Sequence, residues 1–247
     1  FMRSAATRGI MSSFISPDWD DGIGEQFLRN GYIVFDADNR KALNYLTSVV
    51  RPFEPDGTEN LNELKLEAMA KLNVDAKARY LYFLLGKKYL YALVGNELAM
   101  QKKFNLNVQV PNDDKNLLPI HADTWTGDSP FQVVLWVPLV DCYRTKAMWI
   151  LPPEHAKTFH LAGSSEDMFK KIEPHIKYIE IKYGEVMVFN STLPHGNRVN
   201  REDSTRWSLN CRFKSVFSPY GRKELGEHFE PITLRAVSRI GLDYRAP

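Results

Sequence analysis

The feature that most constrains the fold of this sequence is a change in its hydrophobic period near residue 102. Before that point, apolar residues recur every three or four positions in Arg40–Val50, Asn60–Leu72 and Ala76–Met100, which predicts three helices. After it, the segment 104–110 alternates Phe, Leu and Val with amide side chains, which is the period of a β-strand with one polar face. The chain therefore places a β-structure behind a helical first part.

Turn residues divide the second part into further strands. Segments rich in β-branched and aromatic residues are separated by Pro, Gly, Asn and Asp, and they are Phe131–Leu139, Ala147–Leu151, Ile176–Lys182, Glu185–Phe189 and Ser204–Phe217. A shorter helix is predicted over Asp21–Asn30, with a strand after Gly31. The fold class we expect is mainly β with flanking helices (α+β), in which a barrel or sandwich follows a helical N-terminal part.

Length and charge limit the classes of partner. At 247 residues we expect a single domain over residues 11–247, with a helical lead-in to 101, a β core over 102–217 and a C-terminal segment over 218–247. Residues 1–10 are expected to be a leader or tail. With 32 Lys and Arg against 30 Asp and Glu, the chain has no field that favours nucleic acid or an acidic membrane.

Membrane insertion and a disulfide framework are also disfavoured. The longest apolar run, Phe131–Val140, is interrupted and far shorter than the roughly 20 residues of a membrane helix. The chain has only two cysteines, Cys142 and Cys211, which fits a reducing compartment, so a cytoplasmic location is expected. The sequence is compatible with a homodimer.

A His-x-Asp motif and a distant histidine are the candidates for a metal site. His121 and Asp123 are two residues apart, so on an extended chain both side chains point to one face. His195 follows a glycine turn and a strand that can bring it to the mouth of a barrel. Two nitrogen ligands and one oxygen ligand form the set that leaves positions open on non-haem Fe(II). His155, in a Pro-Pro-Glu-His loop, is the competing distal ligand.

The strand after His195 carries a candidate anion site. Its even positions from 206 to 212 are Arg, Ser, Asn and Arg, so one face is strongly polar. Arg206 offers a planar fork that matches a carboxylate at two points, and Ser208 adds a hydroxyl donor on the same face. Arg212 lies about 20 Å further along an extended strand, so the two arginines are not expected to bind the same small anion.

Further polar and aromatic residues are candidates for the wall of the same pocket. Gln109 is a candidate for cosubstrate binding. Candidate substrate-binding residues are Asn107, Trp125, Gln132, Trp136 and Arg212. For each of them, ordinary packing or solvent exposure is the competing interpretation.

Together these motifs resemble the iron(II)/2-oxoglutarate-dependent dioxygenases, in particular the phytanoyl-CoA-dioxygenase-like branch. His121-x-Asp123, His195 and Arg206-x-Ser208 occur in the order of that family, and Phe27–Phe35 is similar to its opening helix-strand segment. Pro152-Pro153-Glu154-His155 departs from the Pro-Gly-Ser-His turn of many relatives. The stretch from His121 to Lys214 looks most similar to oxygenases of bacterial carbohydrate biosynthesis clusters.

The resemblance implies a double-stranded β-helix, also called a jelly roll, of the cupin-like type. It further implies that His121, Asp123 and His195 hold Fe(II), that Arg206 and Ser208 hold 2-oxoglutarate, and that O2 is the oxidant. The implied activity is oxidation, usually hydroxylation, of a C–H bond in a small sugar-like substrate, with release of succinate and CO2. Two alternatives stay open: a metal cupin enzyme that does not use 2-oxoglutarate, and a non-catalytic jelly-roll carbohydrate-binding protein.

Overall fold

Most of the first described elements are helices, as the hydrophobic period predicted. The computed structural model describes residues 22–55, 60–114, 117, 120–159 and 165–245, so the expected leader at residues 1–10 lies outside the described residues. The elements are α2 (Ile23–Asn30), β1 (Tyr32–Asp36), α3 (Arg40–Val50), α4 (Leu61–Val74) and α5 (Ala76–Leu93). The predicted helix 76–100 is wrong at its end, because the chain turns at Gly95, with φ of 115°, and enters β2 (Leu98–Gln101).

A large antiparallel sheet forms one wall of the β core. Its other strands are β3 (Asn105–Gln109), β4 (Gln132–Pro138), β7 (Glu185–Asn190), β9 (Arg206–Ser215) and β10 (Phe229–Pro231). The strand order is β1-β7-β4-β9-β2-β10, and β3 pairs with the first half of β9. β9 is thus the central strand, which hydrogen-bonds to β4 along one edge and to β3 and then β2 along the other.

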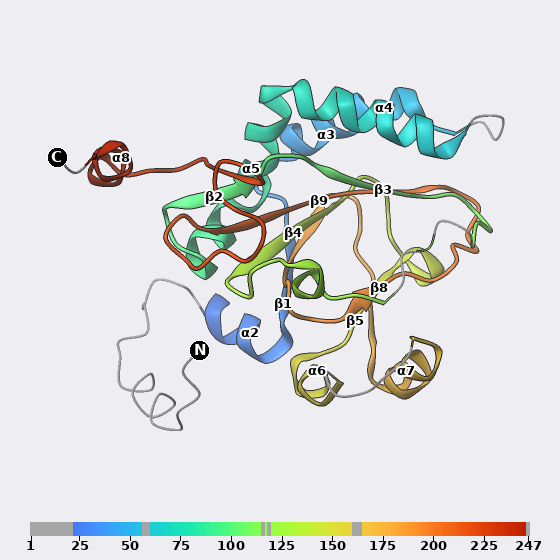
Figure 1. The fold of residues 1–247 in the computed structure, drawn as a ribbon. Coiled ribbons are helices and arrows are strands. Elements are labelled where there is room, and N and C mark those ends of the chain that lie inside the picture. Colours follow the sequence, from blue (N-terminus) through green and yellow to red (C-terminus); the bar gives the residue numbers. More distant parts are fainter. Residues whose placement is uncertain (1–21, 56–59, 115–116, 118–119, 160–164, 246–247) are drawn as a thin grey trace.

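A smaller sheet forms the opposite wall. It consists of β5 (Met148–Ile150) between β6 (Lys177–Ile179) and β8 (His195–Gly196). Two helices that the sequence did not predict, α6 (Pro153–Phe159) and α7 (Ser165–Ile172), lie near this sheet, on the side of the molecule away from α3 and α4 (Figure 1). His155 was predicted to lie in a loop, but it lies on α6 because Pro153 starts a helix at its first position.

Two hydrophobic clusters pack on the two faces of the large sheet. Odd-numbered β9 residues from Trp207 to Phe213 join the helices α3, α4 and α5 in one cluster. Val134 and Trp136 of β4 face the small sheet in the other cluster, together with Trp149. The polar, even-numbered face of β9 is therefore turned toward the interior between the two sheets, as the alternation in its sequence requires. This two-walled antiparallel arrangement confirms the predicted jelly-roll core.

The C-terminal segment covers one edge of the large sheet. β10 pairs with β2, and the chain ends in α8 (Ala236–Asp243), which lies away from the body of the molecule (Figure 1). Over the described residues, every helix is too short or too polar to cross a membrane.

Candidate metal and cosubstrate site

Three predicted ligands meet between the two sheets. One ligand atom from each of His121, Asp123 and His195 can be chosen so that all three lie within 4.8 Å of one another. The backbone explains the meeting: His121 and His195 form an antiparallel bridge, with the His195 amide donating to the His121 carbonyl at 2.9 Å. Asp123 begins a 3-10 turn, Asp123–Thr126, which directs its carboxylate inward.

The hydrogen bond of His195 fixes which ring nitrogen is free. Its Nδ1 lies 2.9 Å from the backbone oxygen of Leu193. A carbonyl oxygen only accepts, so Nδ1 carries the proton and Nε2 keeps the lone pair that a metal requires. Burial lowers the pKa of His195 to about 4, more than the nearby carboxylate of Asp123 raises it. The imidazole is therefore neutral near pH 7.

The two oxygens of the Asp123 carboxylate have different surroundings. Oδ1 accepts a hydrogen bond from the Arg212 guanidinium, whereas Oδ2 is buried without any partner. Burial raises the pKa of Asp123, but Arg212 and the two histidines together lower it by more. The net pKa of Asp123 therefore lies below its usual value. A charged carboxylate with one orphaned oxygen, beside two imidazoles, suits a divalent cation.

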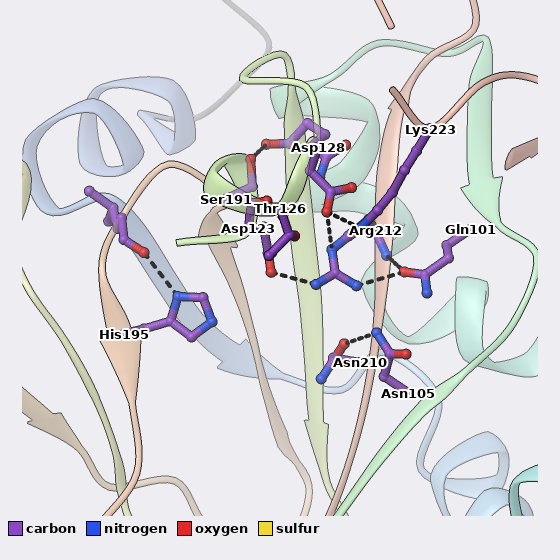
Figure 2. A network of polar contacts seen from close by, with 12 residues as sticks. Gln101, Asn105, Asp123, Thr126, Asp128, Ser191, His195, Asn210, Arg212 and Lys223 are labelled. Carbon is purple, nitrogen blue, oxygen red and sulfur yellow. Dashed lines mark hydrogen bonds and ion pairs between the residues drawn. The ribbon is translucent and has the colours of Figure 1, made fainter. Parts of the chain in front are cut away.

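A chain of charges supports Asp123 from behind (Figure 2). Arg212 also donates to Gln101 Oε1 at 3.0 Å, and its Nε lies 3.6 Å from Asp128 Oδ2. Lys223 donates to the same Asp128 oxygen. The pKa of Arg212 is lowered by burial but raised more strongly by the two carboxylates, so its net pKa is above its usual value. Arg212 was predicted to contact substrate; it lines the cavity, but its side chain donates to Gln101 and to Asp123, a candidate metal ligand.

Arg206 is a buried cation whose partners are all neutral. Arg206 is only 1% exposed, and its guanidinium donates to Asn197 Oδ1 at 2.7 Å and to Asn107 Oδ1 at 2.6 Å. In the part of the chain that the structure describes, no carboxylate lies within ion-pair distance of it. Burial lowers the pKa of Arg206 to about 10. A charge in this position calls for an anionic ligand.

Other unpartnered polar atoms lie on the same face of the sheet. The hydroxyl of Ser208, the Nε of Arg206 and the Oε1 of Gln109 are buried and make no hydrogen bond. Gln109 stands opposite Arg206 in the β3–β9 register, and Asn107 stands opposite Ser208. Natural proteins leave few such groups, so their concentration here indicates a site built for a polar ligand.

The metal triad and Arg206 open into one cavity of about 270 Å³. It is bounded by β3, β9, β4, the small sheet and α4, and its lining includes the predicted residues Asn107, Trp136 and Arg212, together with Lys65, Met69, Asn105, Val134, Met148, Phe189, Asn197 and Asn210. The ring of Trp136 lies with its centre 6.0 Å from the Arg206 guanidinium carbon. The cavity therefore joins one apolar wall to a polar strand face.

Four predicted residues do not line this cavity: Ser208, Trp125, Gln132 and Gln109. Trp125 is 44% exposed and stacks on Phe159 with ring centres 6.1 Å apart. Gln132 lies at the other end of β4 from Trp136, with both amide atoms buried and unpartnered. Gln109 lies opposite Arg206 on β3 but is outside the lining.

Sequence reasoning missed residues whose partners are remote in the chain. Asp128, Lys223 and Asn197 support the site but belong to no motif, and Lys65 reaches the cavity only because α4 packs over it. For Asn197, its position two residues after His195 was an available signal. For the other three, only the fold reveals the proximity.

The donor set matches non-haem iron rather than a structural metal. His121, Asp123 and His195 would hold such an ion at the wall of the cavity, and the buried guanidinium of Arg206 opens into the same cavity. His155, the competing ligand, stacks on His175 with ring centres 4.1 Å apart and is outside the cavity. Fold and site together define a jelly-roll non-haem iron oxygenase.

The family is established by comparison with known sequences. The family model described as phytanoyl-CoA dioxygenase (PhyH) matches residues 53–208, more than half of the chain, and this stretch contains His121, Asp123, His195, Arg206 and Ser208. The chain belongs to the phytanoyl-CoA dioxygenase family. It is accordingly a 2-oxoglutarate-dependent non-haem iron oxygenase, and the predicted cofactors Fe(II), 2-oxoglutarate and O2 are confirmed. A search of the curated proteins gives no significant match.

Solved structures share the fold at low sequence identity. The non-heme monooxygenase ThoJ is 14% identical with a TM-score of 0.65, over 86% of this chain and 84% of that chain. The carbocyclase SnoK from nogalamycin biosynthesis, described as non-heme and alpha-ketoglutarate-dependent, is 14% identical with a TM-score of 0.59, over 89% and 100%. HygX from Streptomyces hygroscopicus, with nickel and 2-oxoglutarate bound, is 13% identical with a TM-score of 0.51, over 79% and 87%.

Proposed function

We propose that this oxygenase hydroxylates a C–H bond of a small polar molecule of the carbohydrate class. The observation that carries the cosubstrate assignment is Arg206, a buried guanidinium that opens into the cavity and has no carboxylate partner among the residues that the structure describes. The size of the cavity, about 270 Å³, and its amide-rich strand face support a small polar substrate rather than a long acyl chain.

Each residue of the site has a separate task. His121, Asp123 and His195 would hold Fe(II) through two imidazole nitrogens and one carboxylate oxygen, and Arg206 with Ser208 would hold the distal carboxylate of 2-oxoglutarate. When bound, the iron, 2-oxoglutarate and O2 supply the oxidation of a C–H bond, with release of succinate and CO2. Asn107 and Asn197 keep the Arg206 fork in one orientation, which reduces the entropy lost when the cosubstrate binds.

The remaining cavity wall positions the substrate. Val134, Trp136, Met148 and Phe189 present apolar surface, and an aromatic ring suits the C–H face of a sugar. Asn105 and Asn210 present amides across the cavity. The two free cysteines, Cys142 and Cys211, support a cytoplasmic location as part of the same proposal, and a homodimer stays a prediction.

The test of the cosubstrate site is an anaerobic titration of the Fe(II) protein with 2-oxoglutarate, followed by the visible charge-transfer band. Arg206→Ala leaves a carboxylate unpaired and is expected to cost about 2–5 kcal/mol of binding, or roughly 30- to 5000-fold. Arg206→Lys restores part of the affinity, because an ammonium lacks the two-point contact. Arg201→Ala, on an exposed loop, is the control and should bind normally.

Two results would contradict the proposal. Unchanged affinity in Arg206→Ala would remove Arg206 from the cosubstrate site, and absence of the band in the wild-type protein would favour a metal cupin that does not use 2-oxoglutarate. The substrate class is tested by screening compounds for stimulated succinate formation. A response confined to acyl chains would overturn the carbohydrate assignment.

A further inference from the structure

Lys65 is a cation of the cavity wall to which the site described above gives no task. It lies on α4, one turn before Met69, and both side chains line the cavity. Ala68 and Leu72, three and seven residues after Lys65, lie on the same side of α4 and are fully buried in the helical cluster. The packing of the helix therefore determines that the Lys65 ammonium is presented to the metal cavity.

The sequence of α4 gives Lys65 no acidic neighbour. In a helix, ion pairs form between residues three or four positions apart, and for Lys65 these positions are Leu61, Asn62, Ala68 and Met69. Lys71 on the same helix differs, because Glu67 lies four residues before it. Within the described residues, Lys65 has neither an ion pair nor a hydrogen bond. Its half-buried position also lowers its pKa by desolvation.

Amide donors line the cavity beside this lysine. Asn105 Nδ2 donates to Asn210 Oδ1 at 3.0 Å, which leaves the NH2 group of Asn210 available (Figure 2). Asn107 gives its oxygen to Arg206, so its NH2 group is likewise left as a donor. With Lys65 these groups form a donor-rich wall on α4, β3 and β9, which suits an acceptor-rich anion.

The charges of the cavity lining also favour an anionic ligand near Lys65. Its lining carries three cations, Lys65, Arg206 and Arg212, against the single carboxylate of Asp123. A divalent metal and a doubly charged 2-oxoglutarate cancel each other, so loading the site leaves this positive surplus in place. Arg212 contacts Asp123 and Asp128, and Arg206 would face the distal carboxylate of 2-oxoglutarate, so Lys65 is the cation of this lining to which the described residues and the cosubstrate give no anionic neighbour.

We propose that Lys65, with the amides of Asn107 and Asn210, binds an acidic group of the substrate, either a carboxylate or a phosphate. The inference rests on the proposed function, and it narrows the substrate class from polar sugars to acidic or phosphorylated ones. A charged group on the α4 side places the neutral part of the molecule toward the metal. The site thereby selects substrates by charge before any C–H bond is selected.

The experiment uses the protein loaded with Mn(II) and 2-oxoglutarate and three matched probes: glucose, glucose 6-phosphate and glucuronate. Paramagnetic relaxation of probe nuclei by Mn(II) reports binding near the metal without turnover. At least one acidic hexose is expected to show saturable relaxation at concentrations where glucose shows little, and the preferred acid identifies phosphate or carboxylate. Lys65→Met should weaken that binding about tenfold or more, as loss of a charged hydrogen bond does, and Lys65→Arg should retain most of it.

Lys71→Met is the matched control on the same helix and should leave the binding of all three probes unchanged. Equal relaxation for glucose and both acids, or equal affinity in wild type and Lys65→Met, overturns the inference. The charge-transfer band of the Fe(II) protein with 2-oxoglutarate is measured in parallel. Absence of this band in the wild-type protein overturns the proposed function itself. Loss of 2-oxoglutarate affinity only in Lys65→Met would instead assign Lys65 to the cosubstrate, and this result would also overturn the inference.

Discussion

At the scale of single residues, the two arginines of β9 differ in their partners rather than in their chemistry. Arg206 is buried and faces neutral amides, whereas Arg212 is only partly buried and faces two carboxylates. A guanidinium that is paired with carboxylates of the protein stabilises the arrangement of those carboxylates. A buried guanidinium without such partners is suited to bind an anionic ligand. The function of each arginine is thus set by the residues that the fold places around it.

Arg212 is predicted to hold Asp123 in the orientation that binds metal. Arg212→Gln removes the charge that fixes Asp123 Oδ1, so metal affinity should fall by about 10- to 100-fold, the range found for groups that orient ligands. Titration with Co(II), followed by its visible absorption, measures this affinity. Arg201→Gln is the control for loss of one guanidinium. If Arg212→Gln binds Co(II) normally, the network of Figure 2 has only a structural role.

At the scale of elements, turns decide where the ligands lie. Gly31 joins α2 to β1 with φ of 78°, and its amide donates to Phe27 O at 2.7 Å. A Cβ at Gly31 would come within 2.3 Å of Leu193 Cδ1. Leu193 is the residue whose carbonyl holds His195. The turn at Gly31 is therefore in contact with Leu193, in the segment that orients His195.

Gly31→Ala is predicted to destabilise the protein more than Gly226→Ala. Both glycines have positive φ, but a Cβ at Gly226 has no atom within 4 Å. Left-handed backbone alone costs a non-glycine residue about 1–2 kcal/mol, and overpacking at Gly31 adds about 1–3 kcal/mol. Urea unfolding of both variants measures the difference. Equal free energies of unfolding would show that the Leu193 side chain moves aside without cost.

At the scale of the whole molecule, the sequence predicted the parts that depend on local period and motif order. The helices and the main strands are of this kind, because they follow from spacing along the chain. The choice of His121, Asp123 and His195 rested on the resemblance as well, because spacing alone left His155 open, and their metal-binding role stays a prediction. The end of α5, the helix α6 and the support of Asp123 by Asp128 and Lys223 were not predicted. They depend on contacts between distant segments, which no local pattern specifies. The substrate-facing role of Lys65 has the same origin.

We expect the metal to bind first and the cosubstrate second, and each binding step should add to the stability of the folded protein. Binding at a hundredfold excess over the Kd adds about 2.7 kcal/mol, which for a chain of this length raises the Tm by roughly 5–10 °C. Thermal unfolding is followed with Mn(II) alone, 2-oxoglutarate alone and both. We expect Arg206→Ala to keep the increment from Mn(II) and lose the increment from 2-oxoglutarate. A full shift with 2-oxoglutarate in metal-free protein would contradict ordered binding.

The central position of β9 has a consequence for how this enzyme can diverge. Its even positions carry Arg206, the proposed cosubstrate anchor, Asn210, an amide of the cavity wall, and Arg212, which donates to Asp123. An inserted or deleted residue after Ser208 would turn Asn210 and Arg212 to the helical face while Arg206 stayed in place. Descendants of this chain are therefore free to change substrate by replacing side chains around the cavity, and insertions are confined to the loops beyond the ends of this strand.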